Sequence, residues 1–367
     1  MQVKLVLSIR SLNIGGAERQ FIELIEHIDK SKFNVTVCTM YGGVQEEMVQ
    51  TIPNIRYYNL EKSGRYDFYK FYRNYSKLLK EINPDVIYSF MGEMNLFSLW
   101  CKPKESKIIW GFRASNRDFS QYGKVVQTIF WLQKKLSSKV DKIIANSHAA
   151  IEFHKQNGFD MSKSIVIPNG IDTERFQRDK SKREAFREKY SLKESDIAIG
   201  IVARIDSIKG YLIFSQVAKK LMEKYPHLYF YSVGSGDKKI QQECEDILGN
   251  TERFIWLGNQ KNVEDFYSGF DIYVSSSFGE GFSNSIAEAM SCECASVVTD
   301  VGDSAMIVSN VGIVVDANSA DSLFLGLEKM IQADHKELGK KSRKRVLENF
   351  SIENMVSNTQ REISNVV

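Results

Sequence analysis

The fold is indicated first by residues 3–28, which read VKLVLSIRSLNIGGAERQFIELIEHI. A short apolar run is followed by paired glycines and then by apolar residues spaced i, i+3, i+4 and i+7. The run predicts a buried strand, and the spacing predicts a helix with one buried face. The glycines at the turn would let a ligand approach the backbone closely, or would serve a tight turn with positive φ. Strand, turn and helix together form a unit of a wound parallel sheet.

The same alternation of short apolar runs and amphipathic stretches continues along the chain and restarts once. In the first half we expect strands at residues 3–9, 34–40, 85–90, 107–112 and 142–146. In the second half we expect strands at residues 197–203, 228–233, 253–257, 271–275 and 295–299. The turn-rich sequence IPNGID at residues 167–172 separates the sets. We therefore predict an α/β protein with two doubly wound domains, whose ligands bind at the carboxyl ends of the strands.

The predicted domains are residues 1–168 and residues 169–350. The last segment, residues 351–367, has a helical pattern and follows the point at which the second domain should be complete. We expect this helix to pack back on the first domain.

Composition narrows the function classes. The chain has 367 residues, of which 43% are hydrophobic, enough for two cores but without an apolar stretch of about 18 residues to span a bilayer. The N-terminal apolar run is too short and broken for a signal peptide. A formal charge of +3 is too small to indicate nucleic-acid binding. Five scattered cysteines, without metal-site spacing, indicate reduced thiols of a cytoplasmic protein.

A second informative stretch is residues 278–290, FGEGFSNSIAEAM. It carries Glu280 before a glycine and Glu288 within an apolar helical run. Eight residues on one helix would leave the two carboxylates about 80° apart, so a shared ligand requires Glu280 in a loop and Glu288 on the helix. Ser283 and Asn284 are favourable N-cap residues, and the free N–H groups of the first turn favour an anion such as a diphosphate. Carboxylates suit sugar hydroxyls, although both glutamates could also be solvated surface residues.

Two further strand ends carry candidate binding residues. Arg204 and Lys209 follow the strand expected at 197–203, and this pair of cations suits a pyrophosphate whose charge grows as its bond to a sugar breaks. A solvated loop could carry the same residues. Gly234, in the sequence VGSGD, forms another glycine turn where the backbone could approach a nucleotide. The G-x-G-x-x-G fingerprint of dinucleotide-binding proteins is absent, which disfavours a dehydrogenase.

Taken together, GGAE at residues 15–18, PNGID at 168–172, Arg204 with Lys209, and the stretch from Glu280 to Met290 resemble the retaining glycosyltransferases of GT-B fold, family 4. The resemblance covers nearly the whole chain, and the following VTDVGDS is similar to bacterial members that build lipopolysaccharide, capsule or other surface glycans. It implies a nucleotide-sugar donor, most often a UDP-sugar, and a glycan or lipid-linked acceptor. No divalent metal or other cofactor is implied.

The resemblance also implies roles for individual residues. Glu280 would contact the donor sugar, Glu288 the ribose, and Arg204 with Lys209 the diphosphate, while Gly16 would cap the diphosphate from the other domain. The remaining donor-binding residues would be the segment from Gly281 through Phe282, Ser283 and Asn284 to Ser285, with Gly234. Family members of this kind resemble front-face catalysts, in which the leaving phosphate oxygen takes the proton from the acceptor hydroxyl.

The chain departs from the family pattern at two positions. Arg113 stands where many members have a histidine near the sugar, and its fixed charge could hold the donor or an acidic acceptor group. Met306 stands where members often have a glutamate, so the hydrogen bond of that glutamate is missing. His148, at the expected start of a helix, is interpreted as a cap or surface residue.

Two basic segments rich in aromatic residues, 66–80 and 121–139, could lie on an anionic bilayer or could be core-packed helices with a solvated basic edge. The first interpretation places the protein peripherally on the inner face of the plasma membrane. Alternative functions are a nucleotide-sugar epimerase or phosphorylase of the same architecture, or a nucleotide-sugar binder without catalysis.

Overall fold

The computed structural model describes residues 2–62, 64, 67–113 and 123–367. The chain forms two compact units, each with its own sheet and core. Unit 1 comprises Met1–Gly170 and Ile352–Val367, and unit 2 comprises Ile171–Ser351. The predicted domain boundary between residues 168 and 169 stays a prediction.

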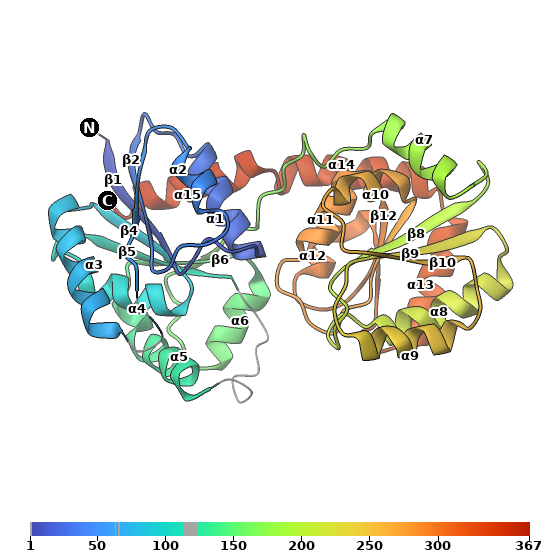
Figure 1. The fold of residues 1–367 in the computed structure, drawn as a ribbon, viewed down its shortest axis with the longest axis horizontal. Helices are drawn as coiled ribbons and strands as arrows, with labels where there is room; N and C mark the ends of the chain where they lie inside the picture. The colour runs from blue at the N-terminus through green and yellow to red at the C-terminus, as the bar shows by residue number, and fades with distance from the viewer. Residues whose placement is uncertain (1, 63, 65–66, 114–122) are drawn as a thin grey trace. The chain divides into compact units, whose positions relative to one another are not determined.

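Unit 1 contains a seven-stranded parallel sheet in the order β3-β2-β1-β4-β5-β6-β7. Its strands are β1 (Val3–Ile9), β2 (Phe33–Thr39), β3 (Ile55–Asn59), β4 (Val86–Phe90), β5 (Lys107–Phe112), β6 (Lys142–Ala145) and β7 (Ser164–Val166). Its helices are α1 (Gly16–His27), α2 (Glu46–Gln50), α3 (Phe68–Ile82), α4 (Gly92–Cys101), α5 (Lys124–Leu136), α6 (His148–Gln156) and α15 (Ile352–Asn365), with a 3-10 turn η2 (Ser137–Lys139). Figure 1 shows α3, α4 and α5 on one face of this sheet and α1 with α15 on the other.

Alternate residues of β1 explain the two layers of unit 1. Leu5 and Leu7 pack with α1 and α15, whereas Val6 packs with α3, α4 and α5. A strand buried on both faces reads as a continuous apolar run, as expected for a central parallel strand. Helix α15 contributes Ile352 and Met355, among others, to the core of unit 1. The expected return of the last helix to the first half of the fold is confirmed.

Unit 2 contains a six-stranded parallel sheet in the order β10-β9-β8-β11-β12-β13. Its strands are β8 (Ile197–Val202), β9 (Leu228–Val233), β10 (Phe254–Gly258), β11 (Ile272–Ser275), β12 (Ala295–Thr299) and β13 (Ile313–Val315). Its helices are α7 (Lys180–Lys189), α8 (Tyr211–Lys224), α9 (Lys238–Leu248), α10 (Val263–Gly269), α11 (Asn284–Ser291), α12 (Ser304–Val308), α13 (Ala320–Gln332) and α14 (His335–Asn349), with η3 (Ser309–Val311). Helices α8, α9 and α13 cover one face, and α7, α10, α11, α12 and α14 cover the other.

All ten expected strands are present, with ends within one residue of the prediction. Strands β3, β7 and β13 were not expected, and all three lie at sheet edges. The five cysteines are free and buried, as expected. None of the helices in the described part of the chain combines the length and apolarity needed to cross a bilayer. Of the two basic segments, residues 66 and 121–122 lie outside the described residues, and the remainder contains residues 68–80 of α3 and the whole of α5.

Candidate functional site in unit 2

The predicted residues of unit 2 gather at the point where the strand order of its sheet reverses. Successive strands run outward from β8 through β9 to β10, and in the opposite direction from β11 through β12 to β13. Strands β8 and β11 are neighbours. The loops that leave their carboxyl ends therefore meet at the topological switch point, where open α/β sheets bind ligands. One loop carries Arg204 and Lys209, and the other carries Glu280.

The loop after β8 is organised by Asp206. Its carboxylate Oδ1 accepts hydrogen bonds from the backbone N–H groups of Ile208 (3.0 Å) and Lys209 (3.2 Å). Its Oδ2 accepts from Nε and Nη2 of Arg204, at 2.9 and 2.7 Å. The Arg204 side chain is nevertheless 75% exposed. One aspartate thus sets the turn before Lys209 and holds a guanidinium that remains accessible to solvent.

Lys209 and Glu280 form an ion pair across the two loops. Lys209 Nζ lies 2.6 Å from Glu280 Oε1, with side-chain exposures of 25% and 11%. The Ser277 hydroxyl donates to the same carboxylate oxygen at 2.7 Å. The two residues are 71 positions apart in the chain, and neighbouring strands bring them together. The site therefore pairs a cation and a carboxylate that are partly shielded from water, where charged groups interact more strongly than at an open surface.

The two loops interlock through their backbones. Phe278 N–H donates to the Ile208 carbonyl oxygen at 2.7 Å, and the Ser276 hydroxyl donates to the Lys209 carbonyl oxygen at 2.9 Å. Gly210 has φ +67°, and a Cβ there would lie 2.0 Å from the Ser276 carbonyl oxygen. Only glycine fits this contact without a shift of the backbone. The position of Lys209 relative to Glu280 is thus fixed by main-chain contacts.

A third loop, after β12, supports the turn at Glu280. Gly302 has φ +57°, and a Cβ there would lie 2.3 Å from the Glu280 carbonyl oxygen and 2.9 Å from that of Gly281. Asp303 N–H donates to the Gly281 carbonyl oxygen at 3.0 Å. The sequence analysis did not identify Gly302 as a site residue. The glycine in VTDVGDS was its only signal, because the close approach of residue 302 to residue 280 depends on the tertiary structure.

Helix α11 begins directly after this turn and carries Glu288, as predicted. Glu288 is 5% exposed, and its Oε2 accepts a hydrogen bond from the Tyr267 hydroxyl at 3.2 Å. Burial, reinforced by the charge of Glu288, raises the pKa of Tyr267 well above its usual range. The phenol therefore stays protonated and donates to the carboxylate. Tyr267 is a second residue that sequence reasoning missed, because an apolar helix position carries no signal for such a contact.

The expected capping of α11 is only partly observed. Ser283 is the N-cap residue, but its hydroxyl makes no capping hydrogen bond. It lies 3.3 Å from the Ser285 hydroxyl, which in turn accepts from the Tyr273 hydroxyl at 2.9 Å. Asn284 is the first helical residue. Phe282 is 6% exposed and lies in the core of unit 2. Ser283 therefore takes the predicted N-cap position, but its hydroxyl lies against the Ser285 hydroxyl and does not cap the helix by a side-chain hydrogen bond.

The glycine turn after β9 has a packing explanation. Gly234 has φ +130°, and a Cβ there would lie 2.0 Å from the Ala203 carbonyl oxygen. A Cβ at Gly236 would lie 2.1 Å from the Ile205 carbonyl oxygen, and Ile205 pairs with Gly236 in a parallel bridge. These glycines let the turn pack against the backbone that carries Arg204. Gly234 therefore helps to position the backbone that carries Arg204.

Candidate residues of unit 1

The two predicted residues of unit 1 follow different strands of its sheet. Gly16 is the first residue of α1, directly after the N-cap Gly15, which is extended at φ −170°. Neither glycine has positive φ, so the alternative of a left-handed turn at the glycine pair is wrong. The first sheet reverses its strand order between β1 and β4, and the loop that leads to Gly16 leaves β1. Gly16 thus lies at the switch point of its own sheet.

Arg113 follows β5 and is held on three sides. Its Nη2 donates to the Tyr88 hydroxyl at 2.9 Å, and its Nη1 donates to Asn169 Oδ1 at 3.3 Å. The guanidinium lies 4.6 Å from the centroid of the Phe90 ring. Burial raises the pKa of the Tyr88 phenol, while the adjacent Arg113 charge opposes this rise. Arg113 is therefore a cation held in position by Tyr88, Asn169 and Phe90.

His148 is the first residue of α6 and is exposed, while the Ser147 hydroxyl caps this helix by accepting a hydrogen bond from the Ala150 N–H at 3.0 Å. The prediction of a surface residue for His148 is confirmed. Among the described residues, Glu23, Glu26 and His27 on α1 are the group whose ligand atoms lie close enough together, within 4.8 Å, to consider a metal ion. Exposed acidic groups of this kind are common without a metal, and none of the three belongs to the predicted site.

Comparison with known proteins

Two family models match the chain, one in each half. Residues 14–175 match the model described as Glycosyltransferase Family 4, and residues 196–333 match the model described as Glycosyl transferases group 1. The chain belongs to the group 1 glycosyl transferases, family 4. It is a glycosyltransferase that uses a nucleotide-sugar donor, and its reaction falls in class EC 2.4.

The relatives of this glycosyltransferase include bacterial enzymes of glycan synthesis. It is 25% identical over 348 residues to N-acetylgalactosamine-N,N'-diacetylbacillosaminyl-diphospho-undecaprenol 4-alpha-N-acetylgalactosaminyltransferase of Campylobacter jejuni, covering 90% of this chain and 91% of the relative. It is 26% identical to UDP-Gal:alpha-D-GlcNAc-diphosphoundecaprenol alpha-1,3-galactosyltransferase of Escherichia coli, over 53% of this chain and 52% of that enzyme.

Solved structures share the fold of the glycosyltransferase. HepE of Anabaena in complex with UDP matches with a TM-score of 0.82 at 17% identity, covering 99% of this chain and 100% of that one. Sucrose-phosphate synthase from Thermosynechococcus elongatus matches with a TM-score of 0.81 at 17% identity, covering 100% and 99% of the two chains. The two Rossmann-like sheets with C-terminal helices are thus the GT-B fold, and the predicted fold class is confirmed.

Proposed function

We propose that this glycosyltransferase moves a sugar from a UDP-sugar, with retention of the anomeric configuration, to a hydroxyl of a lipid-linked or growing glycan in the synthesis of a surface glycan. The names of the Campylobacter and Escherichia coli relatives specify diphospho-undecaprenol acceptors, and the latter specifies a UDP-sugar donor. HepE has been crystallised with UDP and with UDP-glucose. These relatives support the donor base and the acceptor class. We propose a cytoplasmic location, where nucleotide sugars are available.

The observation that carries the proposal is the ion pair of Lys209 and Glu280 at the switch point of the second sheet. A shielded ammonium is suited to a diphosphate whose negative charge increases as its bond to the sugar breaks. The exposed guanidinium of Arg204 offers a planar fork to a second phosphate oxygen. Glu280, held by Lys209 and Ser277, offers acceptor oxygens to the hydroxyls of the donor sugar.

Helix α11 provides the other end of the proposed donor site. The backbone from Gly281 to Ser285 would supply N–H groups at the positive end of the helix, which favours a phosphate. Glu288, about one turn into the helix, would accept hydrogen bonds from the ribose hydroxyls. The N–H groups of α11 and the two glutamates would thus bind different parts of one nucleotide sugar.

The proposed chemistry needs no nucleophile from the protein. As the sugar–phosphate bond breaks, the leaving phosphate oxygen would accept the proton of the attacking acceptor hydroxyl on the same face of the sugar. The protein would contribute by orienting the two reactants and by stabilising the charge on the leaving diphosphate. In unit 1, we propose that Gly16 and Arg113 contribute to donor or acceptor binding.

A donor screen tests the proposal first. UDP-, GDP- and ADP-sugars would be compared by the increase in Tm that each produces, because a ligand at about 100 times its Kd adds about 2.7 kcal/mol to the free energy of unfolding. We expect a UDP-sugar to give the largest increase. A larger increase with another base would refute the proposed donor.

Turnover of that donor then tests the residues. Glu280→Ala and Lys209→Ala should each lower kcat by at least about tenfold, equivalent to about 1.4 kcal/mol of transition-state stabilisation. Lys224 and Glu328 provide a matched control, since they form an ion pair of the same length, 2.6 Å, elsewhere in unit 2. Lys224→Ala and Glu328→Ala should leave kcat unchanged. Near-normal kcat in both site variants would refute the assignment.

The products distinguish the alternatives. A glycosyltransferase releases the nucleoside diphosphate in proportion to glycosylated acceptor. An epimerase would alter the donor sugar without an acceptor, a phosphorylase would require free phosphate, and a binding protein would consume no donor when acceptor is present.

A further inference from the structure

We propose that Glu93 and Arg10 of unit 1 bind neighbouring hydroxyls of the acceptor sugar, so that this pair helps to select the acceptor. The inference rests on the proposed function and adds to it two side chains that recognise the sugar to which the new residue is attached. Both side chains belong to unit 1, whereas the ion pair that carries the proposed function belongs to unit 2.

The pair lies where the strand order of the first sheet reverses. Arg10 directly follows β1, and Glu93 is in the first turn of α4, just after β4. Strands β1 and β4 are neighbours, and Arg10 Nε lies 2.9 Å from Glu93 Oε2. Open α/β sheets bind their ligands at such a point, outside the carboxyl ends of the strands. The pair is therefore placed where unit 1 is expected to bind a ligand.

The backbone that leads to Glu93 is strained. Met91, between β4 and α4, has φ +72° and ψ +156°, a combination that residues other than glycine rarely adopt. The Asn95 N–H donates to the Met91 carbonyl oxygen at 3.0 Å, so the strained residue also fixes the first turn of α4. Such strain persists where the surrounding structure holds it, and it is concentrated at binding and active sites. The strain at Met91 thus fixes the position of Glu93.

Both side chains of the pair can reach a ligand. The exposed fraction is 54% for the Arg10 side chain and 20% for that of Glu93. The Arg10 guanidinium also lies 5.7 Å from the centroid of the Tyr41 ring. A guanidinium has five N–H donors, so the contact through Nε leaves the donors of both Nη atoms. The pair can therefore keep its own geometry while it donates hydrogen bonds to a ligand and accepts others.

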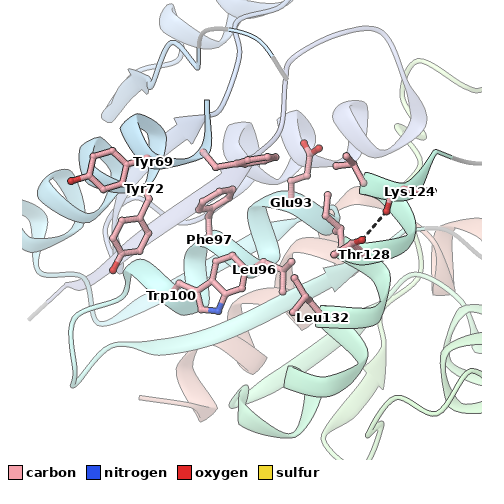
Figure 2. Close-up of a pocket in the computed structure, with 12 residues that line it drawn as sticks. Tyr69, Tyr72, Glu93, Leu96, Phe97, Trp100, Lys124, Thr128 and Leu132 are labelled. Atoms are coloured by element: carbon pink, nitrogen blue, oxygen red, sulfur yellow. Dashed lines mark hydrogen bonds between the residues drawn. The ribbon is translucent and has the colours of Figure 1, made fainter. Parts of the chain in front are cut away.

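Glu93 also lines a cavity of about 590 Å³ between α3, α4 and α5. Small-molecule sites commonly have volumes of about 300–1,000 Å³. In Figure 2, Glu93, Lys124 and Thr128 lie toward one end of this cavity, and the rings of Tyr69 and Tyr72 lie toward the other. The Thr128 hydroxyl donates to the Lys124 carbonyl oxygen at 2.8 Å and can still accept a hydrogen bond. A ligand with several hydroxyls would therefore find space and polar partners beside Glu93.

The opposite charges of the pair favour a neutral ligand with adjacent hydroxyls. A phosphate attracted by Arg10 would also have to approach the carboxylate of Glu93, and a cation attracted by Glu93 would have to approach Arg10. Two neighbouring hydroxyls of a sugar satisfy both groups, since one donates to the carboxylate and the other accepts from the guanidinium. Because the proposed sites for the donor sugar and the diphosphate are in unit 2, the sugar bound by this pair is assigned to the acceptor.

Acceptor kinetics test the pair. The donor found by the thermal screen would be combined with p-nitrophenyl glycosides of glucose, galactose, N-acetylglucosamine and N-acetylgalactosamine, and with N-acetylglucosaminyl-diphospho-undecaprenol. Release of the nucleoside diphosphate above the rate without acceptor identifies the best acceptor. For that acceptor, Glu93→Gln and Arg10→Gln should each raise KM at least about tenfold, because each variant loses a hydrogen bond from a charged group. The kcat and the donor KM should change less than about threefold.

A second Arg–Glu pair supplies matched controls. Arg175 and Glu264 of unit 2 are 3.0 Å apart, with side-chain exposures of 42% and 13%. Arg175→Gln and Glu264→Gln should leave the acceptor KM unchanged. All four variants should show the wild-type increase in Tm with the donor, which establishes that they fold and bind it. A wild-type acceptor KM in Glu93→Gln, or an equal rise in the controls, would overturn the inference and leave the proposed function intact.

Deoxy acceptors separate recognition from a structural role. Analogues of the best acceptor would each lack one sugar hydroxyl. Wild type should lose at least about tenfold in kcat/KM with one analogue, because a site built to bond a hydroxyl discriminates against its absence. Glu93→Gln should discriminate against the same analogue at least about threefold less, since the two changes remove one shared contact. If Glu93→Gln lowers kcat/KM equally for every acceptor, its role is structural and the inference is overturned.

The panel also distinguishes the class of ligand. If Glu93→Gln lowers KM for the diphospho-undecaprenol acceptor and not for the p-nitrophenyl glycosides, the pair faces a phosphate, and the assignment to the acceptor sugar is overturned. If the wild-type protein gains Tm with the donor but glycosylates no member of the panel, the proposed function fails and the inference fails with it.

Discussion

Substitution of Gly302 by alanine should displace the turn at Glu280, although it replaces none of the side chains assigned to the candidate site. An added Cβ would lie 2.3 Å from the Glu280 carbonyl oxygen, whereas Cβ atoms essentially never approach closer than 3.0 Å. The turn at Glu280 must therefore shift by at least 0.7 Å, the difference between these distances. Because a misplacement of about 1 Å in a positioned group can cost about 10²-fold in rate, we expect Gly302→Ala to lower kcat/KM by roughly tenfold to hundredfold.

The same substitution also strains the backbone. Gly302 has φ +57°, and the left-handed region costs a residue with a Cβ about 1–2 kcal/mol. For a unit of this size that cost lowers Tm by about 2–8 °C. Gly249→Ala separates the two effects, because Gly249 has φ +68° and no described atom lies within 4 Å of an added Cβ. With ψ −162° its backbone lies in a region that only glycine adopts readily, so the substitution should lower Tm at least as much as Gly302→Ala and leave turnover unchanged.

The assay is release of the nucleoside diphosphate from the donor identified by the thermal screen, with acceptor present, at a temperature where both variants are folded. If Gly302→Ala turns over donor at the wild-type rate, or if Gly249→Ala loses as much activity as Gly302→Ala, then the packing of residue 302 on the Glu280 turn does not matter for catalysis.

Two other substitutions test buried polar contacts. Tyr267→Phe removes the hydroxyl that donates to Glu288, so we expect a loss of about 1–3 kcal/mol in the free energy of unfolding and a rise in the donor KM that exceeds the change in kcat. Tyr231→Phe is the control, since among the described residues the buried Tyr231 hydroxyl has no hydrogen-bond partner, and its loss should be nearly neutral; equal effects of the two would contradict the reasoning. Burial lowers the pKa of His154 to about 4 from its usual 6.5, so between these pH values the unfolded chain binds a proton that the folded chain does not. The contribution of His154 is complete above pH 6.5 and is lost as the pH falls toward 4, by up to about 3 kcal/mol. His154→Gln should flatten this part of a plot of unfolding free energy against pH, measured by urea titration, and parallel curves for wild type and variant would disprove it.

The edges of the sheets mark the limit of what the sequence predicts about the fold. Central strands are covered by helices on both faces, so they read as mainly apolar runs such as VIYSF in β4, where Ser89 is buried with its apolar neighbours. Edge strand β3, with the sequence IRYYN, is only partly buried and mixes polar with apolar residues. Strands β7 and β13 contain three residues each, too few for a periodic signal. Pairing with a neighbouring strand defines these three edges, and that pairing is tertiary information.

The same limit applies to the candidate site. Glu280 and Glu288 could be assigned to a loop and a helix because the glycine turn and the apolar run are local signals. The ion pair between Lys209 and Glu280 could not be read from the chain, since it depends on the adjacency of β8 and β11. Gly302 stands out only once the loop after β12 is seen against the Glu280 turn. The roles of these residues in donor binding stay predictions until the variants are measured.

The return of α15 to the first sheet has a consequence for how this protein is made. Unit 1 takes its core from residues before 171 and from Ile352, Met355, Val356 and Ile363, which are separated from β1 by more than three hundred positions. During synthesis the first half emerges long before these residues. Its apolar face therefore stays uncovered by α15 while the whole of unit 2 is translated. That interval is an opportunity for aggregation or chaperone binding. For the same reason, a fragment ending at residue 170 would lack part of its core, and an isolated unit 1 would need residues 352–367 supplied through a linker.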